Sequence, residues 1–161
     1  MKVMKFGGTS VGSPERMKNV CQLITKSGKQ TFVVLSAMSG TTNSLVEISN
    51  YFYKKNPDGA HDIINQLERK YMGHVEELYT DPEIKKEITD FLNDRFMYLR
   101  SFSKDTFTSF EERAVVAQGE LLSTNMVTAY LKQIGIKAIL IPALDFMKTD
   151  KNQEPDMNFI K

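Results

Sequence analysis

The sequence predicts an α/β fold in which a mainly parallel sheet is sandwiched between helices and carries an inserted antiparallel helical hairpin. Three short segments, 2–6, 31–35 and 137–141, have the composition of strands. Segments with helical periodicity separate them, and strands divided by helices favour parallel pairing. Two consecutive helical segments that span about 58–103 account for the hairpin.

The composition limits both the number of domains and the classes of partner. A chain of 161 residues is long enough for one compact domain with a core and too short to expect two. The hydrophobic fraction of 41% and the charged fraction of 25% are typical of soluble globular proteins. With 21 basic and 20 acidic residues, the net charge of +1 gives no overall attraction to nucleic acid or to an anionic membrane. We therefore expect neither as a partner.

The amino terminus and the cysteine content are those of a cytoplasmic protein. No apolar run approaches the roughly 20 residues that a membrane span needs. The first residues, 1–5, lead into glycines without the core of a signal peptide. Cys21 is the only cysteine, which excludes an internal disulfide. A cytoplasmic location is the simplest expectation.

The opening segment predicts a strand, a glycine-rich turn, a helix and a second strand. The turn, 7–12, contains three glycines. Ser13 is a good N-cap for the helix, Pro14 suits its first position, and Gly28 provides its end. The second strand, 31–35, is β-branched and aromatic without polar alternation, as expected of a buried parallel strand.

The middle of the chain predicts helices. A loop of small residues, 36–42, precedes a helix that Asn43 can cap. The sequence Asn56-Pro57-Asp58-Gly59 then interrupts the helical pattern. Helical periodicity resumes over about 60–79 and 82–102, and these two segments form the expected hairpin.

The second half of the chain predicts one more helix and a third strand. Asp81, which a proline follows, is a good N-cap for the second hairpin helix. A further helix should run over about 110–133 and end at Gly135, after which 137–141 returns as a buried strand. The tail, 148–161, is polar, as expected of a chain that is cut inside a loop.

The first candidate site is the sequence Lys5-Phe6-Gly7-Gly8-Thr9-Ser10-Val11. A lysine at the end of a strand, followed by glycines whose N–H groups precede a helix, can hold phosphate oxygens. Gly7 and Gly12 have the spacing of a Walker A motif, but Ser13 stands where that motif requires lysine. The dinucleotide-binding pattern Gly-x-Gly-x-x-Gly is absent as well. The alternative is a turn whose glycines only satisfy backbone geometry, with Lys5 in solvent.

There are two further candidate sites. One follows the second strand, and the other lies in the helix predicted over 110–133. The loop 36–43 has hydroxyls and free N–H groups at the carboxyl end of a parallel strand, where ligands bind in open sheets. It could hold a small carboxylate, and the alternative is an ordinary hydroxyl-rich turn. Gly119 allows close approach within a helix, and Glu120 could accept from a substrate ammonium group. The alternative for Glu120 is a solvated helix residue.

Together the three motifs are similar to those of aspartate kinases, members of the amino-acid kinase superfamily. The segment Lys5-Phe6-Gly7-Gly8-Thr9-Ser10-Val11 closely resembles the opening signature of that family. Ser36-Ala37 with Thr42-Asn43 is similar to its second loop, and Gly119-Glu120 with Ser123 is similar to its third. The order and separation agree, so that the resemblance covers essentially the whole chain. It implies a carbamate-kinase-like α/β fold.

The resemblance also implies an activity and a set of site residues. The activity is phosphorylation of the side-chain carboxylate of L-aspartate by ATP to 4-phospho-L-aspartate, the first step of lysine, threonine and methionine biosynthesis. Lys5 would be catalytic, and Ser36, Thr42 and Glu120 would bind aspartate, with Glu120 facing its α-ammonium group. Mg²⁺ would accompany ATP, bound mainly by parts outside this chain, and the full-length protein would be a homo-oligomer. The implied phosphate- and ATP-binding residues are Lys5, Gly7, Gly8, Thr9 and Ser10.

Part of the family pattern has no counterpart in residues 1–161. Aspartate kinases continue with an Arg-Gly-Gly-Ser-Asp segment, a nucleotide lobe and regulatory domains of the ACT type. We therefore expect 1–161 to be the amino-terminal, aspartate-binding part of the kinase domain, inactive by itself. The alternatives are a kinase for acetylglutamate, glutamate or a nucleoside monophosphate, and a non-catalytic small-molecule-binding domain. Fusion to homoserine dehydrogenase and the identity of a feedback inhibitor are left open by the sequence.

Overall fold

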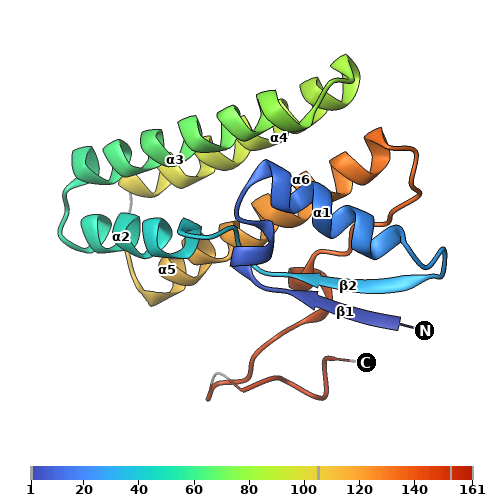
Figure 1. Ribbon diagram of the computed structural model, residues 1–161. Coiled ribbons are helices and arrows are strands. Elements are labelled where there is room, and N and C mark those ends of the chain that lie inside the picture. The colour runs from blue at the N-terminus through green and yellow to red at the C-terminus, as the bar shows by residue number, and fades with distance from the viewer. Residues whose placement is uncertain (1, 105, 153, 161) are drawn as a thin grey trace.

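The structure, a computed structural model, describes residues 2–104, 106–152 and 154–160. A long helical hairpin lies along one side of the molecule, and a small parallel sheet lies at the opposite side near one end (Figure 1). The elements in chain order are β1 (Lys2–Phe6), the 3-10 helix η1 (Gly8–Val11), α1 (Pro14–Thr25), β2 (Thr31–Leu35), α2 (Thr41–Tyr53), α3 (Pro57–Leu78), α4 (Pro82–Ser101), the 3-10 helix η2 (Phe102–Lys104), α5 (Ser109–Val116), α6 (Gln118–Gln133) and α7 (Ala143–Phe146).

Strands β1 and β2 pair in parallel, and α1 connects them. This is the predicted strand, helix and strand unit, and it sets the ends of both strands side by side. The loops that leave the two strands therefore start next to each other, at the same edge of the sheet. The register pairs Lys2 with Thr31, Val3 with Phe32, Met4 with Val33, Lys5 with Val34, and Phe6 with Leu35.

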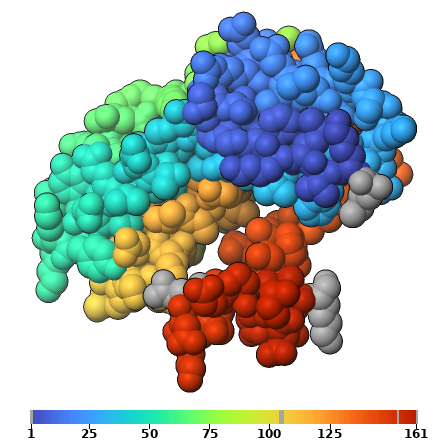
Figure 2. All heavy atoms as spheres, turned by 60° about the horizontal axis from the view of Figure 1, so that its bottom comes forward, coloured from blue at the N-terminus to red at the C-terminus, as the bar shows by residue number. Residues whose placement is uncertain are grey.

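The two faces of this sheet differ, which corrects the expectation of a buried second strand. On the helix side, Leu35 is buried and Val33 packs against the core. On the other side the alternate residues are exposed, and Figure 2 shows β1 at the surface in dark blue. Within the described residues, helices cover only one face, because α1 and α6 both lie between the sheet and the hairpin (Figure 1). The exposed apolar side chains are Val3 (62%), Phe32 (40%) and Val34 (42%).

The core lies between the hairpin and the shorter helices. Helices α3 and α4 run antiparallel, as predicted, and α2 packs against α3 (Figure 1). Cys21 is buried in this core, and burial raises the pKa of its thiol to about 12. The largest fully buried side chains are Tyr71, Tyr79, Phe96, Met17, Met38, Leu45, Ile48, Ile64, Leu78, Leu92, Leu99 and Leu122.

Side-chain caps start four of the helices, α1, α3, α4 and α5, the last through Thr108. The Ser13 hydroxyl accepts from the backbone N–H of Arg16 at 3.3 Å, so that α1 begins at its predicted cap. The Asp81 carboxylate accepts from the first N–H groups of α4, which confirms that cap as well. Asn56 caps α3 through the N–H of Gly59, and the helix therefore starts at Pro57, earlier than the periodicity predicted.

Two helix boundaries differ from the prediction. Asn43 does not cap α2: the helix begins at Thr41, after Gly40 with a left-handed φ of 80°. Glycine adopts this φ readily, and Asn43 lies inside the first turn. The single helix predicted over 110–133 is two helices, α5 and α6, which meet at Ala117. The interruption has no proline or glycine at Ala117, so the composition gave no sign of it.

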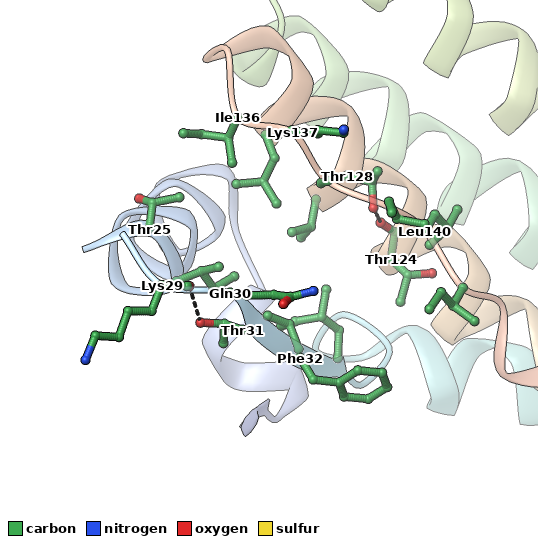
Figure 3. A pocket seen from close by; sticks show the side chains of 18 of the residues that line it. Thr25, Lys29, Gln30, Thr31, Phe32, Thr124, Thr128, Ile136, Lys137 and Leu140 are labelled. Carbon is green, nitrogen blue, oxygen red and sulfur yellow. Dashed lines mark hydrogen bonds between the residues drawn. The ribbon is translucent and has the colours of Figure 1, made fainter. Parts of the chain in front are cut away.

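The segment 137–141, predicted as a third strand, is not a strand. A cavity of about 580 Å³ separates it from β2, and Figure 3 shows Ile136, Lys137 and Leu140 across this space from Thr31 and Phe32. A strand requires a neighbouring edge for its N–H and C=O groups, and the apolar composition of 137–141 does not provide one. The segment is instead largely exposed, with Ile139 at 80%.

Candidate active site

The glycine-rich turn folds so that the Lys5 ammonium group lies beside it. Lys5 is exposed near the end of β1, and its Nζ lies 4.0 Å from the place that a Cβ on Gly7 would take. The turn itself is the short helix η1, in which the Ser10 N–H donates to the Gly7 carbonyl at 2.9 Å. Arg16 from α1 donates to the Thr9 carbonyl at 2.8 Å and fixes the other side of the turn. A cation and a tightly wound glycine turn are thus next to each other.

Hydrogen bonds join this turn to the loop that follows β2. The Ser36 N–H donates to the Phe6 carbonyl and the Ser39 N–H donates to the Gly8 carbonyl, both at 3.1 Å. A Cβ on Gly8 would come within 2.6 Å of the Ala37 carbonyl oxygen. Glycine is therefore required at this position because the two loops touch through their backbones. Gly8 of the first motif thus allows the two loops to contact each other, and this role is independent of phosphate binding by the turn.

The third motif meets the same loop from the side of α6. The Ala37 N–H donates to the Glu120 carboxylate at 3.2 Å, and the Ser123 hydroxyl donates to the Ser36 carbonyl at 2.8 Å. A Cβ on Gly119 would lie 2.7 Å from the Ala37 Cβ, so this glycine lets α6 approach the loop closely. Three motifs that are far apart in the sequence are therefore in contact around Ser36 and Ala37.

Thr42 lies in the first turn of α2, where this loop becomes a helix. The Thr41 N–H donates to the Met38 carbonyl at 2.9 Å, and the next residues begin the helix with their N–H groups at its positive end. Thr42 is exposed, as is Glu120, whereas Ser36 is half-buried. The site is thus open to solvent on one side, as a site for a small polar ligand requires.

Helix α3 adds two residues to this region, Lys70 and Tyr71, that no sequence motif indicated. The Tyr71 hydroxyl shares a buried 3.0 Å hydrogen bond with the Thr41 hydroxyl, and burial raises the pKa of Tyr71. Lys70 Nζ donates to the Ser39 carbonyl at 2.9 Å, and burial lowers the pKa of this lysine. Helical periodicity marks Tyr71 only as a core position, and nothing in the pattern distinguishes Lys70 from a solvated lysine.

The donor set offers no metal centre at this position. Over residues 2–104, 106–152 and 154–160, no group of three or more His, Cys, Asp or Glu side chains could hold a metal ion. Glu120 already accepts from a backbone N–H. The side chains present do not fit a magnesium ion held by this chain alone. In the described part of the chain, none of the helices is both long and apolar enough to cross a membrane.

The fold and the meeting of the three motifs define a class of protein, and comparison with known families agrees. Residues 1–160 match the amino acid kinase family. The chain belongs to this family.

Within the family, the chain is similar to aspartokinases, as the three motifs predicted. It is 35% identical over 154 residues to aspartokinase 1, chloroplastic, of Arabidopsis thaliana, which covers 92% of this chain and 26% of that protein. It is 31% identical over 160 residues to the aspartokinase of Chlamydia muridarum, which covers 96% of this chain and 33% of that protein. The chain therefore spans about a quarter to a third of the length of these relatives.

A solved structure confirms the predicted fold class. The structure of E. coli aspartokinase III in complex with aspartate and ADP, in its R-state, superposes with a TM-score of 0.82. The sequence identity is 24%, and the match covers 99% of this chain and 36% of that one. The shared fold is the amino-acid kinase fold, here helical with a small parallel sheet.

Proposed function

We propose that this chain forms the aspartate-binding and phosphoryl-binding part of an aspartate kinase, which transfers the γ-phosphoryl group of ATP to the side chain of L-aspartate. One observation supports this most directly: the three motifs that resemble those of aspartate kinases are in contact around Ala37. The Ala37 N–H donates a hydrogen bond to Glu120, and both Gly8 and Gly119 approach Ala37 closely. We further propose a cytoplasmic homo-oligomer that acts at the start of lysine and threonine biosynthesis.

Each predicted site residue has a role in this proposal. Lys5 and the N–H groups of Gly7 and Gly8 stabilise the transferring phosphoryl group, and Thr9 and Ser10 extend the turn around the phosphates. Ser36 and Thr42 hold the aspartate carboxylates through their hydroxyls. Glu120 faces the α-ammonium group with the oxygen that does not accept from Ala37. Positioning of the two reactants contributes the remainder of the rate enhancement.

The proposed reaction is an in-line displacement at phosphorus. A side-chain carboxylate oxygen of aspartate forms a bond to the γ-phosphorus of ATP, while the bond from that phosphorus to the β–γ bridging oxygen breaks. The electron pair of the broken bond stays on ADP, and the product is an acyl phosphate. No general base is required, because a carboxylate is already ionised at neutral pH. The residues of this chain bind and neutralise charge, and they transfer no proton.

The aspartate site is tested by replacing Glu120 with glutamine. Glutamine keeps an oxygen that can accept from the Ala37 N–H, so the loop contact is retained while the negative charge is lost. Calorimetric titration of the chain with L-aspartate should show a roughly tenfold weaker dissociation constant for E120Q than for the unmodified chain. E47Q removes the same charge from an exposed position of α2 and should leave the affinity unchanged.

Succinate separates the role of Glu120 from an indirect effect. Succinate has both carboxylates of aspartate but no ammonium group, so it should bind the unmodified chain and E120Q equally. A glutamate titration tests the specificity for aspartate. Equal aspartate affinity in the unmodified chain and E120Q would contradict the role of Glu120, and stronger binding of glutamate than of aspartate would contradict the proposed substrate.

We also propose that transfer requires polypeptide beyond these residues. Two aspartokinase relatives are about three to four times longer, since this chain covers 26% and 33% of them. The chain alone should release no ADP above background in a coupled assay with ATP, magnesium and aspartate. ADP release at the rate of a complete aspartokinase would overturn this proposal.

A further inference from the structure

Helix α3 contacts the loop between β2 and α2 on both sides of Gly40. Lys70 donates to the carbonyl of Ser39, the residue before Gly40, and Tyr71 pairs with the hydroxyl of Thr41, the residue after it. Gly40 has a φ of 80°, so the chain reverses there before α2 begins. Two consecutive residues of the helical hairpin therefore hold the two ends of this reversal.

The Ser39 carbonyl depends on Lys70 for its hydrogen bond. Several other groups of this loop bond to β1, η1 and α6 or within the loop itself, including the N–H of Ser39 to Gly8 and the N–H of Thr41 to Met38. Within the described residues, no backbone N–H donates to the Ser39 carbonyl. Ser39 is exposed and Lys70 is half-buried, so the loss of Lys70 removes a charge-assisted hydrogen bond that ties this part of the loop to α3 and should release it.

The Lys70 ammonium group is partly shielded from solvent. Lys70 is half-buried, and desolvation by burial lowers its pKa. His74, one turn further along α3, has its pKa lowered by burial first and by the Lys70 charge second. A lowered pKa reduces the charged fraction of the imidazole, and with it the repulsion between His74 and Lys70, although the Glu77 charge acts in the opposite direction. A partly desolvated ammonium group makes a stronger hydrogen bond than a solvated one.

We propose that Lys70 is a positioning residue of the aspartate site, which acts by holding the loop between Ser36 and Thr42. This rests on the proposed function, because Ser36 and Thr42 are the aspartate-binding residues assigned above. Lys70 lies in the hairpin, outside all three motifs, and does not belong to the phosphate-binding turn. The hairpin thus serves the site through a side chain and not only as a packing element.

The loop itself is tested without any ligand. Amide hydrogen exchange of the ligand-free chain, followed by NMR, should be about tenfold faster at Ser39 and Thr41 in K70M than in the unmodified chain. K70R retains a donor and should restore exchange to within about twofold of the unmodified chain. R69M removes a positive charge from the neighbouring exposed position of α3 and should leave the exchange at both amides unchanged.

The second measurement is aspartate affinity, by titration of the same variants. We expect about tenfold weaker binding for K70M, with affinity recovered in K70R and unaltered in R69M. Thermal unfolding of each variant shows whether the chain is folded. Should K70M not fold, K70Q is the substitute, since glutamine is uncharged and too short to reach the Ser39 carbonyl from the same backbone position.

Each result has a distinct meaning. Faster exchange together with weaker aspartate binding, both reversed by arginine, supports the positioning role. Unchanged exchange in K70M overturns it, whatever the affinity. Faster exchange with unchanged affinity also overturns it, because the loop order then does not matter to the ligand. If the unmodified chain does not bind aspartate, the proposed function fails and the positioning role with it, while the exchange data still report whether Lys70 orders the loop.

Discussion

Replacing Lys5 by methionine should lower the rate of phosphoryl transfer to aspartate by about 10²–10³-fold, the loss that follows removal of one preorganised charge from a transferring group. Methionine retains most of the length and apolar volume of the lysine side chain and removes its charge. The Lys5 ammonium lies beside the glycine turn, and the side chain is exposed, so the fold should not depend on it. The effect should therefore appear in kcat and not in the melting temperature.

The measurement requires a polypeptide that supplies the rest of the kinase around this chain, and a coupled assay of ADP release with saturating ATP and aspartate. K2M is the matched control. Lys2 is an exposed lysine at the other end of the same strand, so its loss changes the net charge equally. Activity of K5M within about threefold of the K2M control would remove Lys5 from the catalytic machinery.

Replacing Gly119 by alanine should lower the free energy of unfolding by about 1–3 kcal/mol, because the new methyl group would lie 2.7 Å from the Ala37 Cβ. Neither atom belongs to a flexible side chain, so α6 and the loop must move apart. The separation would stretch the bonds from Ala37 to Glu120 and from Ser123 to Ser36, and aspartate binding should weaken as well. Urea unfolding followed by circular dichroism measures the first effect.

Gly73 provides the matched control for this substitution. It lies inside α3, is exposed, and a Cβ there would meet nothing within 4 Å. The same change from glycine to alanine should therefore raise the free energy of unfolding by about 1 kcal/mol through helix propensity. The decisive result is that the free energy of unfolding falls for the substitution at Gly119 and rises for the one at Gly73. A stabilising or neutral effect of G119A would show that the contact with Ala37 is not tight.

The sequence predicted correctly those helix ends that depend on residues only a few positions away, such as N-caps and helix-ending glycines. Ser13 and Asp81 start their helices because their side chains accept from N–H groups only two or three residues away. Gly28 and Gly135 follow their helices with φ values of 59° and 75°, which composition can anticipate. The three motifs, read in order, also gave the family and the fold class.

The errors concern features that distant residues decide. The segment 137–141 has the composition of a strand, but pairing depends on an edge that lies across a cavity. The break at Ala117 places Gly119 against the loop after β2, a contact between positions more than eighty residues apart that no local pattern records. Lys70 was missed for the same reason, since its partner is Ser39 on another element.

The exposed face of the small sheet has a consequence for the behaviour of the chain in solution. Within the described residues β1 and β2 pair only with each other, so each strand keeps one unpaired edge, and the face beside these edges carries Val3, Phe32 and Val34. Unpaired edges next to apolar side chains are templates for association between molecules. We therefore expect self-association of the chain to begin at this sheet and to increase with protein concentration.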